Sequence, residues 1–83
     1  MKARVVVTLK KSVLDPQGVA VQHALSHLGF PEVQDVRLGK LIELDLSESD
    51  PARARERLKA MCDKLLANTV IEEYRIESVG DGA

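Results

Sequence analysis

Hydrophobic and polar residues alternate along the first ten positions of the chain. The apolar side chains of one face fall on every second residue: Ala3, Val5, Val7 and Leu9. A period of two is typical of a β-strand that buries one face. The pattern therefore predicts a strand over Lys2–Lys10, with Val6 as an apolar residue on its otherwise polar face.

Two aspartate–proline pairs, Asp15-Pro16 and Asp50-Pro51, each precede a segment with apolar residues at helical spacing. An aspartate carboxylate can accept the free N–H groups of a first helical turn, and proline has no N–H to leave unsatisfied there. Both pairs therefore predict helix starts. Capping explains the two carboxylates without a catalytic role.

The two predicted helices are expected to end differently. Gly29 should close the first in a left-handed conformation, because glycine lacks the Cβ that disfavours it. Asn68 should cap the second, since asparagine tolerates the same region. The second helix carries an apolar stripe for the core: Ala54, Leu58, Met61, Cys62 and Leu65.

A hairpin and a last strand complete the pattern. Val33–Leu46 holds alternating residues around Gly39-Lys40, a pair that suits a tight hairpin turn with a positive φ at the glycine. Val70–Val79 is rich in β-favouring residues and is predicted to be the final strand.

The predicted order is strand, helix, strand, strand, helix, strand. Right-handed crossovers favour folding this order into a four-stranded, mostly antiparallel sheet with both helices on one face, a ferredoxin-like α+β arrangement. We predict a single domain over residues 1–79 and a frayed C-terminal tail over residues 80–83.

Composition limits the classes of function. The 83 residues carry a net charge of −1, which gives no electrostatic field suited to nucleic acid or an anionic membrane. No apolar run reaches the ~20 residues of a membrane span. The single cysteine, Cys62, cannot form an intrachain disulfide, which favours a cytoplasmic location. So short a chain buries a small core, and this favours oligomerisation.

No residue completes a catalytic or metal site. Cys62 lies in the apolar stripe, where we expect packing rather than nucleophilic chemistry. His23 and His27 have the spacing of a two-histidine clamp, but zinc needs a third ligand and none adjoins them. We expect two solvated histidines, with a pH-sensitive partner contact as the alternative. The chain is expected to hold no catalytic residue, cofactor or metal of its own.

Three segments carry a resemblance to a known family: SVLDPQG (Ser12–Gly18), VRLGK (Val36–Lys40) and MCDKLLANTVIE (Met61–Glu72). In this order, across most of the chain, they resemble the PurS family. Members of that family are small subunits of bacterial and archaeal phosphoribosylformylglycinamidine (FGAM) synthase.

The resemblance implies a non-catalytic structural subunit of an ATP-dependent C–N ligase in de novo purine biosynthesis. Its partners would be further copies of itself (a homodimer or homotetramer), a large synthetase subunit (PurL) and a glutaminase subunit (PurQ). The chain would bridge the other two, so that ammonia from glutamine converts formylglycinamide ribonucleotide (FGAR) to FGAM. ATP and magnesium would belong to the synthetase.

Four polar residues within these segments are candidate partner contacts: Arg37, Lys40, Asn68 and Thr69. They lie at the ends of predicted elements, where binding residues concentrate. The plain alternative is that Gly39-Lys40 is a turn and Asn68-Thr69 a helix exit. Turn chemistry explains Gly39 and Asn68 but hardly Arg37.

Two other functions stay open. An ACT-type regulatory module, which binds a small molecule, shares the order of elements, although Asp15-Pro16-Gln17-Gly18 spaces its turn differently. A small hydrolase or transferase that uses Cys62 or the histidine pair is a third class.

Overall fold

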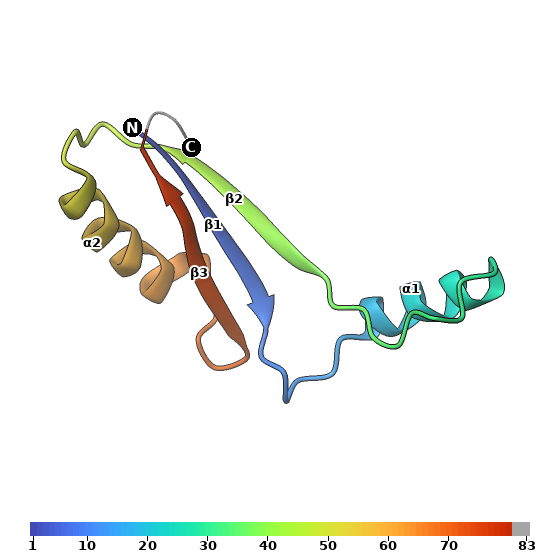
Figure 1. Cartoon of the computed structure of the whole chain (residues 1–83). Coiled ribbons are helices and arrows are strands. Elements are labelled where there is room, and N and C mark those ends of the chain that lie inside the picture. Colours follow the sequence, from blue (N-terminus) through green and yellow to red (C-terminus); the bar gives the residue numbers. More distant parts are fainter. Residues whose placement is uncertain (81–83) are drawn as a thin grey trace.

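The first strand of the chain lies at the centre of the sheet (Figure 1). The computed structural model describes residues 1–80. The elements follow in this order: β1 (Lys2–Leu9), α1 (Pro16–His27), β2 (Gly39–Asp45), α2 (Pro51–Met61), the π-helical turn η1 (Cys62–Leu66) and β3 (Glu72–Val79).

The sheet of the described residues has three strands in the order β2-β1-β3. Both outer strands run antiparallel to β1, with Val6 opposite Leu41 on one side and opposite Arg75 on the other. The outer strands are therefore parallel to each other. Helix α2 connects them as the crossover of a β-α-β unit, with β1 inserted between its two strands.

The predicted four-stranded, ferredoxin-like sheet with two helices on one face is wrong for the described chain. The coarser prediction, a small α+β domain with an antiparallel sheet, is confirmed. In a ferredoxin-like fold α1 would lead into a strand parallel to β1, but residues 33–38, which would form that strand, form none. The ACT-type alternative depended on the same arrangement and loses that support.

The missing strand is the first arm of the predicted hairpin, residues 33–38. Two of its backbone carbonyl oxygens are bonded to α1: the Gln22 side-chain amide donates to those of Val33 and Gln34. The expected turn at Gly39 is also wrong, because Gly39 is the first residue of β2 and has no positive φ. A Cβ there would lie 2.6 Å from the Val7 carbonyl oxygen, so close strand approach explains this glycine.

One face of the sheet packs on α2 and η1. The alternation predicted for β1 is confirmed, since its buried side chains meet Leu58 and Cys62 from the helical layer. The core is small and consists of these buried residues: Ala3, Val5, Val7, Leu58, Cys62 and Ala67. No residue of α1 belongs to it.

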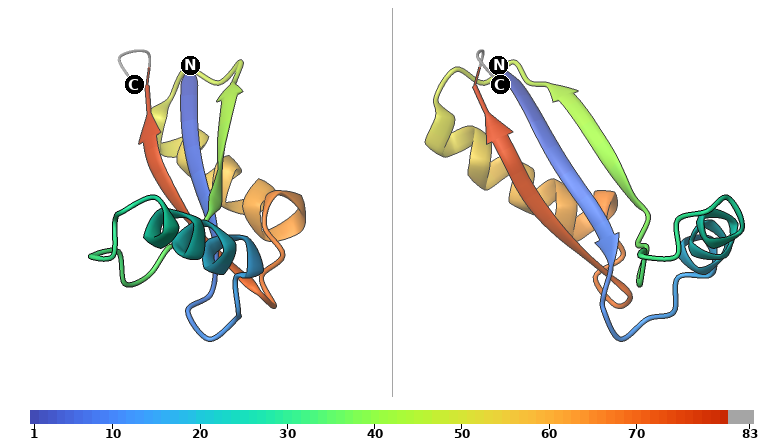
Figure 2. Two further views of the ribbon diagram at one scale, coloured as in Figure 1. Left: turned by 90° about the vertical axis from the view of Figure 1, so that its right-hand side faces the viewer. Right: turned by 45° about the vertical axis from the view of Figure 1, so that its right-hand side comes forward.

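Helix α1 lies beyond the end of the sheet and apart from α2 (Figures 1 and 2). The Cα radius of gyration is 16.0 Å, against about 12 Å expected for a compact chain of this length. The extents of 48 × 29 × 14 Å describe a long, thin molecule. We call residues 12–38, which hold α1 and the segments that join it to the sheet, the arm.

The helix starts are as predicted and one of the ends is not. Asp15 and Asp50 are N-caps followed by proline, and Gly29 has the expected positive φ of 100°. Asn68 is not left-handed. The second helix instead ends in η1, whose Ala67 N–H donates to the Cys62 carbonyl oxygen five residues back.

This π-helical turn changes which side chains enter the core. The α-helical pattern predicts Leu65 on the buried stripe, but Leu65 is 82% exposed and Leu66 packs against the core instead. A π-turn holds one extra residue, so it rotates the following positions around the helix axis.

Candidate assembly surface

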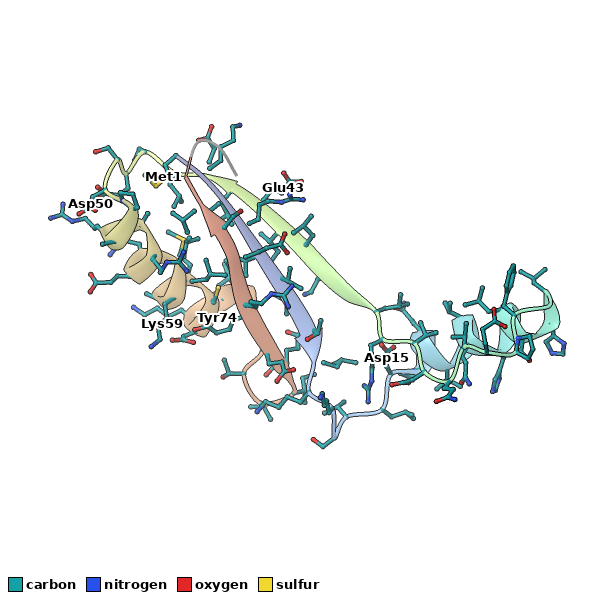
Figure 3. All side chains as sticks on the ribbon, in the orientation of Figure 1. Met1, Asp15, Glu43, Asp50, Lys59 and Tyr74 are labelled. Atoms are coloured by element: carbon teal, nitrogen blue, oxygen red, sulfur yellow. The ribbon has the colours of Figure 1, made fainter. Side chains whose placement is uncertain are left out.

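Asp15 joins the start of α1 to the start of β2. Its carboxylate accepts the N–H of Gly18 at 2.9 Å and the N–H of Leu38 at 2.8 Å. The first bond caps the helix, and the second connects residues 23 positions apart. Asp15 is the buried charged residue of the described chain, and Figure 3 shows it where the arm meets the sheet.

These hydrogen bonds also set the ionisation of Asp15. The backbone N–H groups of Leu38 and Gly18 stabilise the carboxylate, and the Arg37 guanidinium adds a smaller favourable interaction. Together they hold the pKa of Asp15 below its ordinary value, against the opposing effect of burial.

Arg37 ties the two segments of the arm together. Its guanidinium donates to the Val13 carbonyl oxygen at 2.6 Å and to the Lys11 carbonyl oxygen at 2.9 Å. The side chain predicted to face a partner is thus engaged within its own chain. We interpret Arg37 as a residue that positions the arm.

Gly18 allows the two segments to approach closely. A Cβ at this position would overlap the Val36 carbonyl oxygen. Together with Asp15 and Arg37, this contact forms the neck, by which we mean the junction of residues 11–18 with residues 36–38. The neck accounts for two of the three segments that carry the family resemblance, and sequence reasoning missed the role of Gly18.

The arm beyond the neck exposes apolar surface. Gly18 is the buried residue of α1, so the apolar side chains of this helix are mostly left exposed by the rest of the chain. The large apolar residues exposed on the arm are Leu14, Val19, Val21, Leu28, Phe30 and Leu38. Solvent-exposed apolar surface of this extent marks an interaction site.

His23 and His27 lie on the arm and are both exposed. Among residues 1–80 no group of three histidine, cysteine or acidic side chains could hold a metal ion. The structure therefore gives no geometry for the zinc clamp.

Two of the other predicted contact residues meet at the sheet end nearest the neck. The Lys40 ammonium lies 3.8 Å from one carboxylate oxygen of Glu72, and the other oxygen accepts the Asn68 N–H at 2.7 Å. The Asn68 side chain accepts the N–H of Val70, which makes an Asx turn. Thr69 is exposed beside it. Whether these residues touch a partner stays a prediction.

Cys62 is buried in the core, as predicted. Burial raises the pKa of its thiol, and the nearby Asp63 carboxylate raises it further. Both effects disfavour the thiolate that nucleophilic catalysis needs. Within the described chain, neither helix is long and apolar enough to cross a lipid bilayer.

Comparison with known proteins agrees with this arrangement. The family model "PurS: Phosphoribosylformylglycinamidine (FGAM) synthase" matches residues 2–80. The phosphoribosylformylglycinamidine synthase subunit PurS of Bacillus subtilis is 61% identical over 77 residues, which are 92% of this chain and 89% of that protein.

Solved structures share the fold. The C2 crystal form of Bacillus subtilis PurS is 59% identical and has a TM-score of 0.80, over 92% of this chain and 94% of that chain. A chain in the structure of PurLQS from Thermotoga maritima is 30% identical, with a TM-score of 0.82 over 95% of this chain and 99% of that chain.

Proposed function

The chain belongs to the PurS family of FGAM synthase, and we propose that it is the structural subunit that bridges the synthetase and the glutaminase of that enzyme. The resemblance read from three sequence segments is confirmed by the family match. The bridged subunits are PurL and PurQ, and the similar chain within PurLQS supports this assignment.

The observation that carries the proposal is the amount of uncovered surface. The chain exposes 6014 Å², whereas a compact 9.1 kDa protein exposes about 4,900 Å². The excess of roughly 1,100 Å² is larger than the ~800 Å² that one partner contributes to a standard interface. Much of the exposed apolar surface lies on the arm, which is shaped to reach other subunits.

In this proposal the reaction takes place in the partners. The synthetase holds FGAR, ATP and magnesium, and the glutaminase releases the ammonia that converts FGAR to FGAM. This chain keeps the two subunits in register for ammonia transfer. The buried thiol of Cys62 supports a role without nucleophilic chemistry in this chain.

Assembly also supplies the cover that the sheet lacks. Within one chain α1 does not pack on the sheet and the strand expected at residues 33–38 is absent, so neighbouring subunits would provide a helix and a strand in their place. The domain in this proposal spans residues 1–79. The predicted tail begins at Gly80, whose N–H donates to the Lys2 carbonyl oxygen; residues 81–83 lie outside the described part.

Reconstitution tests the bridging role. The synthetase and glutaminase are assayed with and without this chain, and FGAM formation driven by glutamine is compared with formation driven by added ammonia. We expect omission of the chain to abolish the glutamine-driven reaction and spare the ammonia-driven one. If glutamine-driven turnover were the same with and without this chain, the bridging role would be contradicted.

Two exposed leucines give a matched pair for the arm. Leu28 is 73% exposed on the arm, and Leu65 is 82% exposed on η1. We expect Leu28→Asp to reduce glutamine-driven turnover by at least tenfold, and Leu65→Asp to change it little. Equal effects would show that the arm has no special role.

A further inference from the structure

The chain passes between the sheet and the arm twice (Figure 1). The outgoing segment runs from β1 to α1, and the returning segment runs from the arm into β2. No residue of α1 belongs to the hydrophobic core. The contacts within the neck therefore set the orientation of the arm relative to the sheet.

The outgoing segment is fixed to the sheet before it reaches the arm. The Lys10 N–H donates to the Ile71 carbonyl oxygen at 2.9 Å, and the Val13 N–H donates back to the Lys10 carbonyl oxygen at 2.9 Å. These bonds form a turn that is held against the residue preceding β3. The Arg37 guanidinium binds two carbonyl oxygens of this turn, those of Lys11 and Val13.

The returning segment is bound at two adjacent residues to two different parts of the neck. Arg37 binds the turn that is anchored to the sheet, and the N–H of Leu38 binds the Asp15 carboxylate at the start of α1. Two such contacts prevent the rotation that a single contact would allow. Arg37 is exposed, so its hydrogen bonds and not core packing keep it in place. Its planar guanidinium fixes two bonds in one geometry, which a lysine ammonium does not reproduce.

The arm is long enough to magnify a small movement at the neck. Helix α1 has 12 residues, so it is about 18 Å long at the usual rise per residue. A rotation of about 20° at the neck would move the far end of the helix by roughly 6 Å. This displacement is about twice the diameter of a water molecule. A loosened neck would therefore open a contact made by the arm to water.

We infer that Arg37 is a positioning residue for ammonia transfer, because its two bonds hold the arm in the orientation that keeps the partner subunits in register. The inference rests on the proposed function, in which the arm reaches those subunits. Without Arg37 the arm still offers the same exposed apolar residues to a partner, but it must be ordered on binding. A saturating concentration of the variant chain therefore restores assembly, whereas the register varies and ammonia escapes into water.

The coupling of the two reactions measures this escape. Each glutamine hydrolysed releases one ammonia and each FGAM formed takes up one, so the ratio of glutamate to FGAM counts the ammonia that is lost. With the chain at saturation, confirmed by sedimentation of the complex, we expect Arg37→Ala to raise this ratio by about threefold or more. The ammonia-driven rate should stay the same.

Two further variants test whether the geometry of Arg37 is responsible. Arg37→Lys keeps the charge but loses the paired geometry, and it should give an intermediate ratio of glutamate to FGAM. Arg53→Ala removes an exposed arginine of α2. It is the matched control and should keep the wild-type ratio. Circular dichroism of each variant checks that the chain stays folded.

The orientation of the arm is measured without any partner subunit. Ser26 on α1 and Ser49 before α2 are exposed, and cysteines at these positions carry spin labels, while the buried Cys62 does not react. Labelled chains are diluted into unlabelled chains, so that distances between copies do not contribute. Double electron–electron resonance should give a narrow distance distribution with Arg37 in place and a clearly wider one in Arg37→Ala.

The inference would be overturned by a distance distribution in Arg37→Ala as narrow as in wild type, or by an unchanged ratio in this variant at saturation. A fully coupled Arg37→Lys chain, or an equal rise of the ratio in Arg53→Ala, would also contradict it. Failure of the proposed function gives a different result. Glutamine-driven turnover is then the same without the chain, and the spin-label distances still show whether Arg37 holds the arm.

Discussion

Asp15 shows how one side chain can serve two elements. A helix cap needs only the bond to Gly18, and the sequence predicts that bond from the aspartate–proline pair. The bond to the Leu38 N–H depends on a segment 23 residues away and has no local signature. Of the two hydrogen bonds that this carboxylate accepts, the sequence therefore predicts the one from Gly18 but not the one from Leu38.

We expect acid to weaken the fold partly through Asp15. Its folded pKa lies below the ordinary 3.8, so its contribution to stability is complete above that value and is lost as the pH falls through the folded pKa. Asp15→Asn should therefore reduce the dependence of unfolding free energy on pH below about pH 4. Urea unfolding between pH 7 and pH 2 measures this slope, and an unchanged slope would contradict the role of Asp15.

Gly18→Ala should loosen the arm. Alanine normally stabilises a helix relative to glycine by roughly 0.5–1 kcal/mol, but here the added Cβ overlaps the Val36 carbonyl oxygen. We expect Gly18→Ala to lower the free energy of unfolding by about 1–3 kcal/mol, which is typical of overpacking. Hydrogen exchange should become faster in α1 while β1 keeps its protection.

Gly29→Ala provides the comparison for this variant. Gly29 has a positive φ but no atom within 4 Å of an added Cβ. Gly29→Ala should therefore lower the free energy of unfolding by ~1–2 kcal/mol, which is the cost of placing alanine in the left-handed conformation. Faster exchange in β1 of Gly18→Ala would show that the glycine supports the core rather than the neck.

Among the elements, β1 and α1 followed their local patterns and the segment after α1 did not. The alternation of β1 was decisive because the strand lies at the centre of the sheet with one face on the core. Residues 33–38 have similar alternation, yet their hydrogen bonds go to Gln22 and Asp15. Alternation predicts an extended backbone but does not identify its partner.

The π-turn gives a prediction at the scale of an element. Leu66→Ala should destabilise the chain by about 1–2 kcal/mol, because a partly buried side chain leaves the core. Leu65→Ala should stay within about 0.5 kcal/mol of wild type, since this residue is mostly exposed. Thermal or urea unfolding of the two variants measures the difference. If Leu65→Ala destabilised the chain more than Leu66→Ala, the helix would have the α-helical register that the sequence predicts.

At the scale of the whole molecule, the chain is a thin sheet with one helical layer and a projecting arm (Figure 2). Its core consists of a few buried residues on one face. So small a core gives modest stability to an isolated chain. Association that buries the arm and the free edge would therefore contribute much of the stability of the working form.

This dependence predicts a melting temperature that rises with protein concentration. Binding between folded copies stabilises the fold by mass action, so a hundredfold excess over the dissociation constant adds about 2.7 kcal/mol. Differential scanning calorimetry across a hundredfold range of concentration measures the effect. A constant melting temperature would show that the chain is stable as a monomer.

The sequence by itself determined what local physics controls: the buried face of β1, the two aspartate–proline helix starts, the left-handed Gly29 and the burial of Cys62. It also carried the family resemblance, because that resemblance depends only on residue order. The tertiary structure alone decided where the elements lie. The neck and the absence of a strand at residues 33–38 depend on contacts between distant residues, which no local period records. The π-turn departs from the α-helical period that the sequence predicts. Thus the sequence predicted an assembly subunit, and the structure showed the exposed apolar arm on which the proposed assembly rests.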